Sequence, residues 1–334
     1  MSILQPTRLP AIGDVIRAHQ IVKKHAHRTP VLTSRSVNAI LGANLYLKCE
    51  NFQKVGAFKI RGASNAVFSL TDDEAKKGVT THSSGNHAAG LALAASLRKI
   101  PAYIVMPDNA PAIKKKAVEG YGGKITFCKP TQKDREETLR KIQEQTGAVF
   151  IHPYDNFNVI CGQGTASLEL IDDYPDLDMV IAPVGGGGLL SGTLTFTKGF
   201  CPAIRVYGTE PCNADDAFRS LRDKTLHPSV NPNTVADGLR SSLSELTFQI
   251  ISAKCDGIVT VTEEGIIAAM RMIWERMKII IETSSAVPIA AIIEHPEIFA
   301  GKKVGVIISG GNVDLDNLPF KKEAMTEITP PCTV

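Results

Sequence analysis

The sequence lacks features that mark several classes of protein. Among its 334 residues, no apolar run approaches the roughly 18 residues that a membrane-spanning helix needs. The 37 basic and 34 acidic residues nearly balance, and no long run of either sign occurs. Nucleic-acid-binding proteins usually concentrate basic residues in a stripe. We therefore expect no nucleic-acid partner and no membrane partner.

Cysteine pairs and metal-binding histidine patterns are also missing. The seven cysteines form no CxxC pair, and the eight histidines show neither an HExxH pattern nor zinc-finger spacing. The N-terminal segment does not have the basic start and apolar core of a secretory leader. An odd number of cysteines without such a leader favours reduced thiols. We therefore expect a cytoplasmic protein without a disulfide framework or a zinc site.

Apolar runs of strand length alternate with segments of helical spacing along most of the chain. Segments 86–98 and 134–146 carry apolar side chains three or four residues apart and are predicted helices. Continuous apolar strands separated by helices indicate parallel sheets with helices on both faces. The chain, long enough for about two domains, is thus predicted to be a doubly wound α/β protein. The predicted strands are 44–48, 102–106, 124–128, 149–152, 179–184, 205–209, 257–261 and 304–309.

Small and polar residues gather where several predicted strands end. Lys59 lies between Phe58 and Ile60, with Gly56 and Gly62 nearby to allow close approach of another group. A lysine in an apolar pocket has a lowered pKa and an amine that can form a Schiff base. On this segment alone, an ordinary surface lysine is the favoured interpretation.

A second segment, 81–88, stands between an apparent strand and a predicted helix. Its small and polar residues supply free backbone N–H groups, which suit an anion. A simple helix cap would explain one of these residues but not all of them. They are Ser83, Ser84, Asn86 and His87.

Two glycine-rich segments follow further predicted strands. Four consecutive glycines are more than a turn needs, and they favour a backbone wrapped around a phosphate. Neither GxGxxG nor a P-loop pattern fits this stretch, so the phosphate is not expected to belong to a dinucleotide. Segment 309–314, SGGNVD, is a second strand-end loop and is weak evidence by itself. The four glycines are Gly185, Gly186, Gly187 and Gly188.

The order GAFKIRGA, SSGNH, GGGG and SGGNVD resembles the fold-type II pyridoxal-phosphate enzymes, whose fold is tryptophan synthase beta-like. Within them, the sequence is most similar to the serine/threonine dehydratase family, which includes serine racemases. The resemblance covers about residues 11–316. It implies a homodimer whose subunits have two domains with open doubly wound sheets. The implied large domain is 1–77 with 157–334, and the small mobile domain is 78–156.

The resemblance also assigns cofactor contacts. Lys59 would form the internal aldimine with pyridoxal 5'-phosphate, and Gly185–Gly188 would hold the phosphate. Asn86 would contact the ring 3-hydroxyl, and Glu282 would lie near the ring. Ser309 would hydrogen-bond the pyridine nitrogen, and a serine there does not favour a protonated ring. A short-lived carbanion is then expected, which suits rapid reprotonation or loss of a β-leaving group.

The resemblance implies two proton-transfer groups on opposite faces of the substrate Cα. Lys59 would serve one face, and Ser84 the other. A free serine hydroxyl is a poor base, so its surroundings would have to tune it. The residues implied to contact the substrate are Ser83, Ser84, Asn86, His87, Arg135 and Ser242.

Segment EPCNADD, residues 210–216, matches a divalent-cation site of the family. Its ligands would be Glu210, Asp216 and the backbone carbonyl of Ala214, a hard oxygen set that suits Mg²⁺, with Ca²⁺ or Mn²⁺ as alternatives. By itself, the segment would be interpreted as an exposed acidic helix start. ATP is implied as an activator bound between subunits. Its contacts would be Lys54, Tyr121 and Asn312.

The implied activity is interconversion of L- and D-serine, with elimination of water to give pyruvate and ammonia. Two alternatives stay open: a threonine, serine or threo-3-hydroxyaspartate dehydratase without significant racemisation, or an aspartate racemase. The presence of Lys59, Ser84 and Ser309 argues against a catalytically dead cofactor-binding protein. The sequence departs from the family pattern at Thr283, where a proline is usual, and at 154–156, where it reads YDN. These departures leave the substrate preference open.

Overall fold

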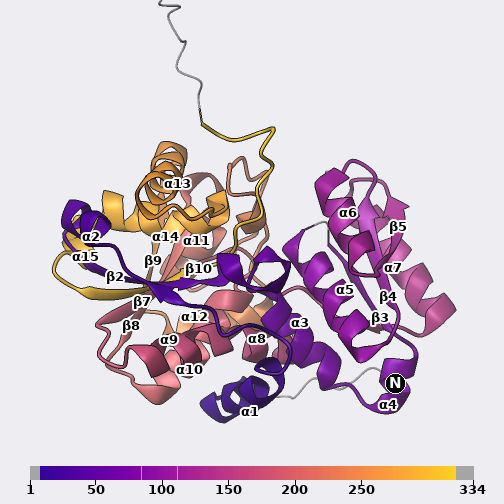
Figure 1. The fold of residues 1–334 in the computed structure, drawn as a ribbon. Helices are drawn as coiled ribbons and strands as arrows, with labels where there is room; N and C mark the ends of the chain where they lie inside the picture. The colour runs from indigo at the N-terminus through magenta and orange to yellow at the C-terminus, as the bar shows by residue number, and fades with distance from the viewer. Residues whose placement is uncertain (1–7, 84, 111, 321–334) are drawn as a thin grey trace, which may run out of the picture.

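The computed structural model describes residues 8–83, 85–110 and 112–320 (Figure 1). It contains a six-stranded sheet of order β1-β2-β10-β7-β8-β9 and a four-stranded sheet of order β5-β4-β3-β6. All pairings are parallel except that of β1 with β2. The strands are β1 Val31–Leu32, β2 Asn44–Cys49, β3 Val79–His82, β4 Ala102–Pro107, β5 Lys124–Cys128, β6 Val149–Phe150, β7 Met179–Pro183, β8 Arg205–Pro211, β9 Gly257–Val261 and β10 Lys303–Ile308.

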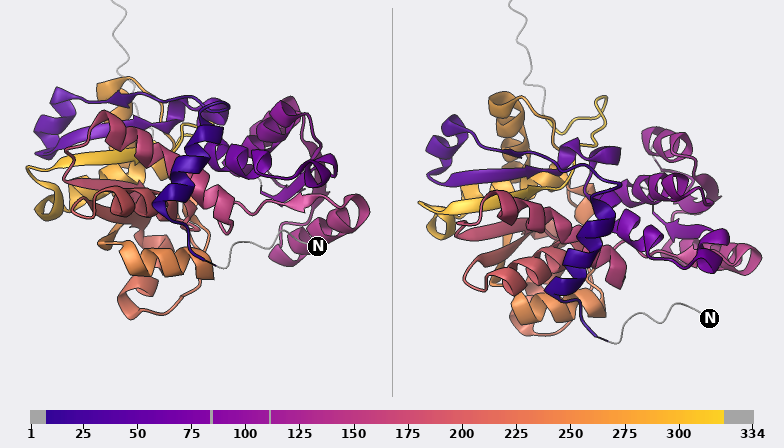
Figure 2. Two further views of the ribbon diagram at one scale, coloured as in Figure 1. Left: turned by 90° about the horizontal axis from the view of Figure 1, so that it is seen from below. Right: turned by 60° about the horizontal axis from the view of Figure 1, so that its bottom comes forward.

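Helices connect the strands and cover both sheets, and Figure 2 shows the same two-part arrangement from other directions. The α-helices are α1 Ile12–Val22, α2 Arg35–Leu41, α3 Lys59–Phe68, α4 Asp72–Lys76, α5 Asn86–Arg98, α6 Ala112–Gly120, α7 Gln132–Thr146, α8 Phe157–Gln163, α9 Thr165–Asp173, α10 Gly188–Phe200, α11 Asp216–Asp223, α12 Glu245–Lys254, α13 Glu263–Met277, α14 Thr283–Glu294 and α15 Pro296–Phe299. The short 3-10 helices are η1 Glu50–Phe52, η2 Lys54–Gly56, η3 Cys212–Ala214 and η4 Asp237–Leu239.

Alternate side chains of the central strands enter different cores. On β7, Met179 and Ile181 pack with α13 and α14, whereas Val180 and Ala182 pack with α9, α10 and α12. On β4, Ile104 packs against α3 and α5. Because successive residues of a strand point to opposite faces, apolar runs without alternation signal strands covered on both sides. The predicted doubly wound α/β fold is therefore confirmed.

The predicted elements form, with small differences at their ends. The helix predicted at 86–98 is α5, and that at 134–146 is α7, which begins two residues earlier because the Thr131 hydroxyl caps it. The strand predicted at 149–152 is shorter, since β6 ends at Phe150. Pro153 has no N–H to continue the ladder, and the chain turns there. The apparent strand before segment 81–88 is β3, whereas β1 was not predicted.

The predicted domain limits at residues 77 and 157 stay a prediction. Residues 79–150 supply all four strands of the smaller sheet. However, α3 buries Ile60, Ala63 and Val67 in the core beneath this sheet. The two parts of the molecule therefore share α3, whose first residue is Lys59.

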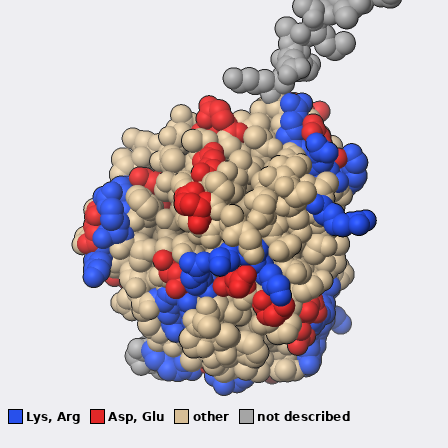
Figure 3. Space-filling view, turned by 90° about the vertical axis from the view of Figure 1, so that its left-hand side faces the viewer, with Lys and Arg blue, Asp and Glu red and all other residues tan. Residues whose placement is uncertain are grey.

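The surface and the thiols agree with the composition. Lys and Arg side chains lie interspersed with Asp and Glu on the face in Figure 3, so this face carries no large patch of one charge. The six cysteines in the described segments are free. No helix in those segments is long and apolar enough to cross a bilayer.

Candidate functional site

Lys59 lies where the two sheets meet. The backbone N–H of Phe58 donates to the carbonyl of Ser309 at 3.0 Å, which fixes the start of α3 against the end of β10. The Lys59 Nζ donates to the Pro153 carbonyl at 3.2 Å. Burial lowers the pKa of Lys59 to about 8, and the Glu282 carboxylate opposes this shift. About one-tenth of the Lys59 amine is therefore neutral and nucleophilic at pH 7, far more than for a lysine with the usual pKa.

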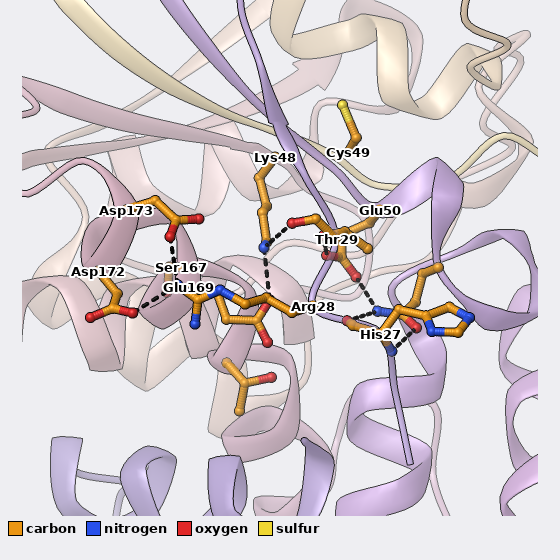
Figure 4. Close-up of polar contacts among 12 residues, drawn as sticks. His27, Arg28, Thr29, Lys48, Cys49, Glu50, Ser167, Glu169, Asp172 and Asp173 are labelled. Carbon is orange, nitrogen blue, oxygen red and sulfur yellow. Dashed lines mark hydrogen bonds and ion pairs between the residues drawn. The ribbon is translucent and has the colours of Figure 1, made fainter. Parts of the chain in front are cut away.

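Buried ion pairs fix the position of α3. Arg61 pairs through Nε with Glu50 at 2.7 Å and through Nη2 with Glu169 at 2.7 Å, and Lys48 pairs with Glu169 at 2.7 Å. Thr29 donates to Glu50 at 2.6 Å, and Figure 4 shows Lys48, Glu50 and Glu169 converging. The four charged side chains are at most 2% exposed. We call Lys48, Glu50, Arg61 and Glu169 the balanced cluster, since its two cations meet two anions.

Asn86, at the start of α5, faces the buried carboxylate of Glu282, which directly precedes α14. Its Nδ2 donates to both Glu282 oxygens at 3.2 Å, and its Oδ1 accepts from Asn312 Nδ2 at 2.9 Å. Burial, and secondarily Asp237, raise the pKa of Glu282 to about 7. The structure thus brings together two residues assigned to the cofactor and one assigned to ATP.

The loop before α5 carries the other substrate candidates. Ser84 lies outside the described residues. The Ser83 hydroxyl accepts from Gly85 N–H at 3.4 Å. The His87 Nε2 lies 3.1 Å from the Ile151 carbonyl and must donate to it, while burial lowers the pKa of His87 to about 3. The neutral His87 ring therefore has no second N–H for a substrate carboxylate, and only its backbone N–H can bind one.

The glycine loop, Gly185–Gly188, is buried between β7 and α10. A Cβ on Gly186 would lie 2.3 Å from ring atoms of Tyr154, and Gly187 has a φ of +84°. Only glycine therefore fits at these two positions. The loop leads into the N-terminus of α10, a helix of 13 residues, whose first N–H groups suit an anion.

Ser309 is buried directly after β10, and a residue that sequence reasoning missed supports it. The Ser285 Oγ lies 2.9 Å from the Ser309 Oγ, and it accepts from Gly310 N–H at 2.7 Å. The Ser285 Oγ also lies 2.7 Å from the Gly310 carbonyl, so its single proton goes either to that carbonyl or to Ser309. When it goes to Ser309, the proton of Ser309 is free for another acceptor, such as a ring nitrogen. The run TSSA at 283–286 gave no signal that its second serine contacts Ser309.

A cavity of about 780 Å³ lies between the two parts of the molecule, and Asn86 and Glu282 are among the residues that line it. An ion pair of 2.7 Å between Lys114 and Asp237 spans it, and both residues line it. Tyr121 and Asn312, assigned to ATP, also line the cavity. Lys54 instead donates to the His25 carbonyl at 2.7 Å. The structure therefore brings two of the three ATP candidates together.

Two further residues predicted to contact the substrate, Ser242 and Arg135, form no hydrogen bond to Lys59 in the described part of the chain. The Ser242 hydroxyl accepts from Ser229 N–H at 2.8 Å. The Nε of Arg135, on α7, is buried without a hydrogen-bond partner.

The predicted metal ligands form a pair of buried acids. Glu210, in β8, and Asp216, the first residue of α11, are both 0% exposed. Glu210 accepts the N–H groups of Ala217 at 3.1 Å and Phe218 at 2.9 Å, and Asp216 Oδ2 accepts that of Leu243 at 3.3 Å. The interpretation as an exposed acidic helix start is therefore wrong. We call Glu210 and Asp216 the acid pair.

The acid pair carries uncompensated negative charge. Burial, and then the charge of Asp216, raise the pKa of Glu210 well above its usual range, while burial raises that of Asp216 to about 6. The buried Oδ1 of Asp216 has no partner, and neither acid forms an ion pair within the described residues. Those residues contain no group of three metal-binding His, Cys, Asp or Glu side chains. A hard cation completed by carbonyls, such as that of Ala214, and by water fits this pair.

Comparisons with known proteins extend over nearly the whole chain. A family model described as pyridoxal-phosphate dependent enzyme matches residues 22–310. A beta-hydroxyaspartate dehydratase of Paracoccus denitrificans is 50% identical over 312 residues, which cover 93% of this chain and 99% of the relative. Serine racemase of Dictyostelium discoideum is 49% identical over 319 residues, 94% of this chain and 98% of the relative. The structure of maize serine racemase matches with a TM-score of 0.91 and 44% identity, covering 92% of this chain and 95% of that chain.

Proposed function

Because the chain belongs to the family of pyridoxal-phosphate-dependent enzymes, we propose that it interconverts L- and D-serine and also dehydrates serine to pyruvate and ammonia. The observation that carries this proposal is the position of the partly neutral Lys59 amine close to the glycine loop. The amine donates to the Pro153 carbonyl, and the next residue, Tyr154, packs on the glycine loop. The 49% identity to the serine racemase of Dictyostelium discoideum supports the choice of serine.

The described residues fit the cofactor. Lys59 would carry it, and the N–H groups of Gly185–Gly188 would hold its phosphate. Asn86 and Ser309 would bind the two polar positions of the ring. When bound, pyridoxal phosphate withdraws electrons from the substrate α-carbon and so acidifies its Cα–H bond.

The proposed residue roles divide racemisation from elimination. The Lys59 amine, with a pKa of about 8, takes the α-proton from one face of L-serine. To form D-serine, Ser84 returns a proton to the opposite face. Elimination instead releases the β-hydroxyl as water after Lys59 has acted, and it needs no group on the second face.

Several finer assignments belong to the same proposal. The acid pair and the Ala214 carbonyl hold Mg²⁺, or Ca²⁺ or Mn²⁺, and the orphaned Asp216 Oδ1 supports this role. ATP binds as an activator at Tyr121 and Asn312, and Lys54 leaves the His25 carbonyl to reach it. The enzyme is a cytoplasmic homodimer in which residues 78–156 close over the substrate.

A second candidate is dehydration of a 3-hydroxyaspartate without significant racemisation. The 50% identity to the Paracoccus dehydratase favours it as much as 49% favours the racemase. Both activities need Lys59, whereas only racemisation needs Ser84.

One experiment separates the candidates. Purified protein is incubated with L-serine, L-threonine, L-aspartate or threo-3-hydroxyaspartate, and the chiral amino acids and keto acids are measured together. We expect D-serine and pyruvate from L-serine. Oxaloacetate from hydroxyaspartate with no D-serine from L-serine would replace the racemase proposal by the dehydratase.

A further inference from the structure

A short turn joins the smaller sheet to α8 and is organised around one imidazole. The Nδ1 of His152 accepts the backbone N–H of Asp155 at 2.8 Å and that of Tyr154 at 3.3 Å. A side-chain atom thus satisfies two N–H groups that no strand or helix pairs. We call residues 152–155 the connecting turn.

The imidazole that caps the connecting turn stays neutral. Because Nδ1 accepts hydrogen bonds, the ring proton must lie on Nε2. Burial lowers the pKa of His152 to about 4, although Asp155 opposes this shift. The neighbouring titratable groups His82 and Lys59 shift the pKa of His152 in the same direction as burial. The cap is therefore intact throughout the neutral pH range.

The connecting turn touches both parts of the proposed cofactor site. The Pro153 carbonyl accepts from Lys59 Nζ at 3.2 Å. The next residue, Tyr154, lies over the glycine loop, since a Cβ on Gly186 would be 2.3 Å from its ring and one on Gly188 would be 2.8 Å from its Cβ. Two neighbouring residues thus contact the lysine and the phosphate loop.

Aromatic contacts extend the turn toward the substrate loop. The His152 ring stands edge-on to Tyr154, with centroids 4.6 Å apart, and edge-on to His82 at 6.0 Å. His82 is the last residue of β3 and directly precedes Ser83. One side chain therefore links the turn to the strand that presents the substrate loop.

We propose that His152 is a positioning residue for the cofactor site: its Nδ1 fixes the connecting turn, and the turn sets Lys59 and the glycine loop at a fixed separation. His152 acts through Pro153 and Tyr154 and touches no reacting atom. This inference rests on the proposed attachment of pyridoxal phosphate to Lys59. The imidazole works as a hydrogen-bond acceptor, not as an acid or base.

A matched pair of amides tests the acceptor role. His152→Asn places its Oδ1 near the position of Nδ1, whereas His152→Gln carries the same group one carbon further, near Nε2. Each purified holoenzyme is diluted, and the visible absorbance of bound pyridoxal phosphate is followed as it dissociates. We expect His152→Gln to lose the cofactor about tenfold faster than wild type, a factor of the size of one hydrogen bond. His152→Asn should stay within about twofold.

Thermal unfolding of each cofactor-free protein shows whether the variants fold. If His152→Gln does not fold, His152→Phe replaces it, because phenylalanine keeps the ring and lacks the acceptor. Equal cofactor loss in the amide pair, or wild-type retention by His152→Phe, would overturn the inference alone. Borohydride trapping of the wild-type cofactor on a residue other than Lys59 would overturn the proposed function, and this inference with it.

Discussion

Two groups of buried charge in this molecule differ in how they are compensated. In the balanced cluster, Arg61 and Lys48 meet Glu50 and Glu169. The acid pair is equally buried, yet within the described residues it has no cation at ion-pair distance, its closest donors are backbone N–H groups, and the Asp216 Oδ1 has no hydrogen-bond partner. The charges of the first group balance one another within the chain, whereas those of the second do not.

The difference suggests a general way to assign buried charges. Burial of an uncompensated carboxylate costs free energy, so a folded protein keeps one only where something else stabilises it. Lys59 and Glu282 lie between the two extremes, because the pKa of each is shifted toward its neutral form. We therefore assign the balanced cluster to structure and the other three groups to ligands and chemistry.

The largest expected effect is the loss of turnover when Lys59 is replaced. Lys59 lies on α3, the helix that carries Arg61 of the balanced cluster. Lys59→Ala should reduce turnover at least about 10³-fold, because it removes a positioned acid–base group as well as the proposed covalent attachment. Borohydride should trap no cofactor on this variant. Lys133→Ala, an 84% exposed lysine of α7, is the matched control and should behave as wild type. Full turnover of Lys59→Ala would contradict the mechanism.

The next largest effect is a loss of stability when a substitution breaks the balanced cluster. Arg61→Met leaves two buried carboxylates with a single lysine, and it should lower the free energy of unfolding by about 3–5 kcal/mol. Arg28→Met removes the exposed ion pairs with Asp172 and Asp173 and should cost at most about 1 kcal/mol. Chemical denaturation of the two variants measures the difference. Equal losses would show that the cluster is no more structural than a surface pair.

The third effect is a pH dependence that comes from Glu282. Folding raises its pKa from 4.5 to about 7, so the folded state binds this proton more tightly than the unfolded state does. The contribution of Glu282 to the stability of cofactor-free protein should therefore fall by about 3 kcal/mol as the pH rises from 4.5 through 7. The acid pair, whose pKa values are also raised, adds a change of the same sign, which Glu282→Gln should keep. Glu282→Gln should lack the Glu282 step when unfolding is followed across the range. An unchanged step in the variant would assign the dependence to another group.

The smallest expected effect is the stabilisation of the acid pair by a divalent cation, which the balanced cluster does not need. Added Mg²⁺ at about 100 times its dissociation constant should stabilise wild type by about 2.7 kcal/mol, because it binds only the folded acid pair. Glu210→Gln with Asp216→Asn keeps the shape and removes the charge, so it should show no response to Mg²⁺ or EDTA in thermal unfolding. If EDTA leaves wild type unchanged, the cation assignment fails.

Local patterns were readable from the sequence. The helix at 86–98 was predicted with its observed ends, because apolar spacing and a polar start both lie within one segment. The glycine loop was also recognisable, since Gly186 and Gly187 have a local requirement for glycine that the run itself displays.

Contacts between distant segments could not be predicted in this way. Arg61 and Glu169 are 108 residues apart, and nothing local says that they meet. For the same reason, the support of Ser309 by Ser285 and the cap formed by His152 appear only in the folded chain. The complete burial of Glu210 depends on contacts between β8 and α11, so the segment by itself favoured a surface position.

The central claim is that proton transfer on two faces of the substrate makes this protein a racemase. The most direct test follows D-serine and pyruvate in one tube, from L-serine, with wild type and with Ser84→Ala. We expect wild type to form both products, and the variant to lose D-serine formation by about 10²–10⁴-fold while it keeps some pyruvate formation. D-serine formation by Ser84→Ala near the wild-type rate would contradict the role of Ser84. No D-serine from wild type would contradict the racemase itself.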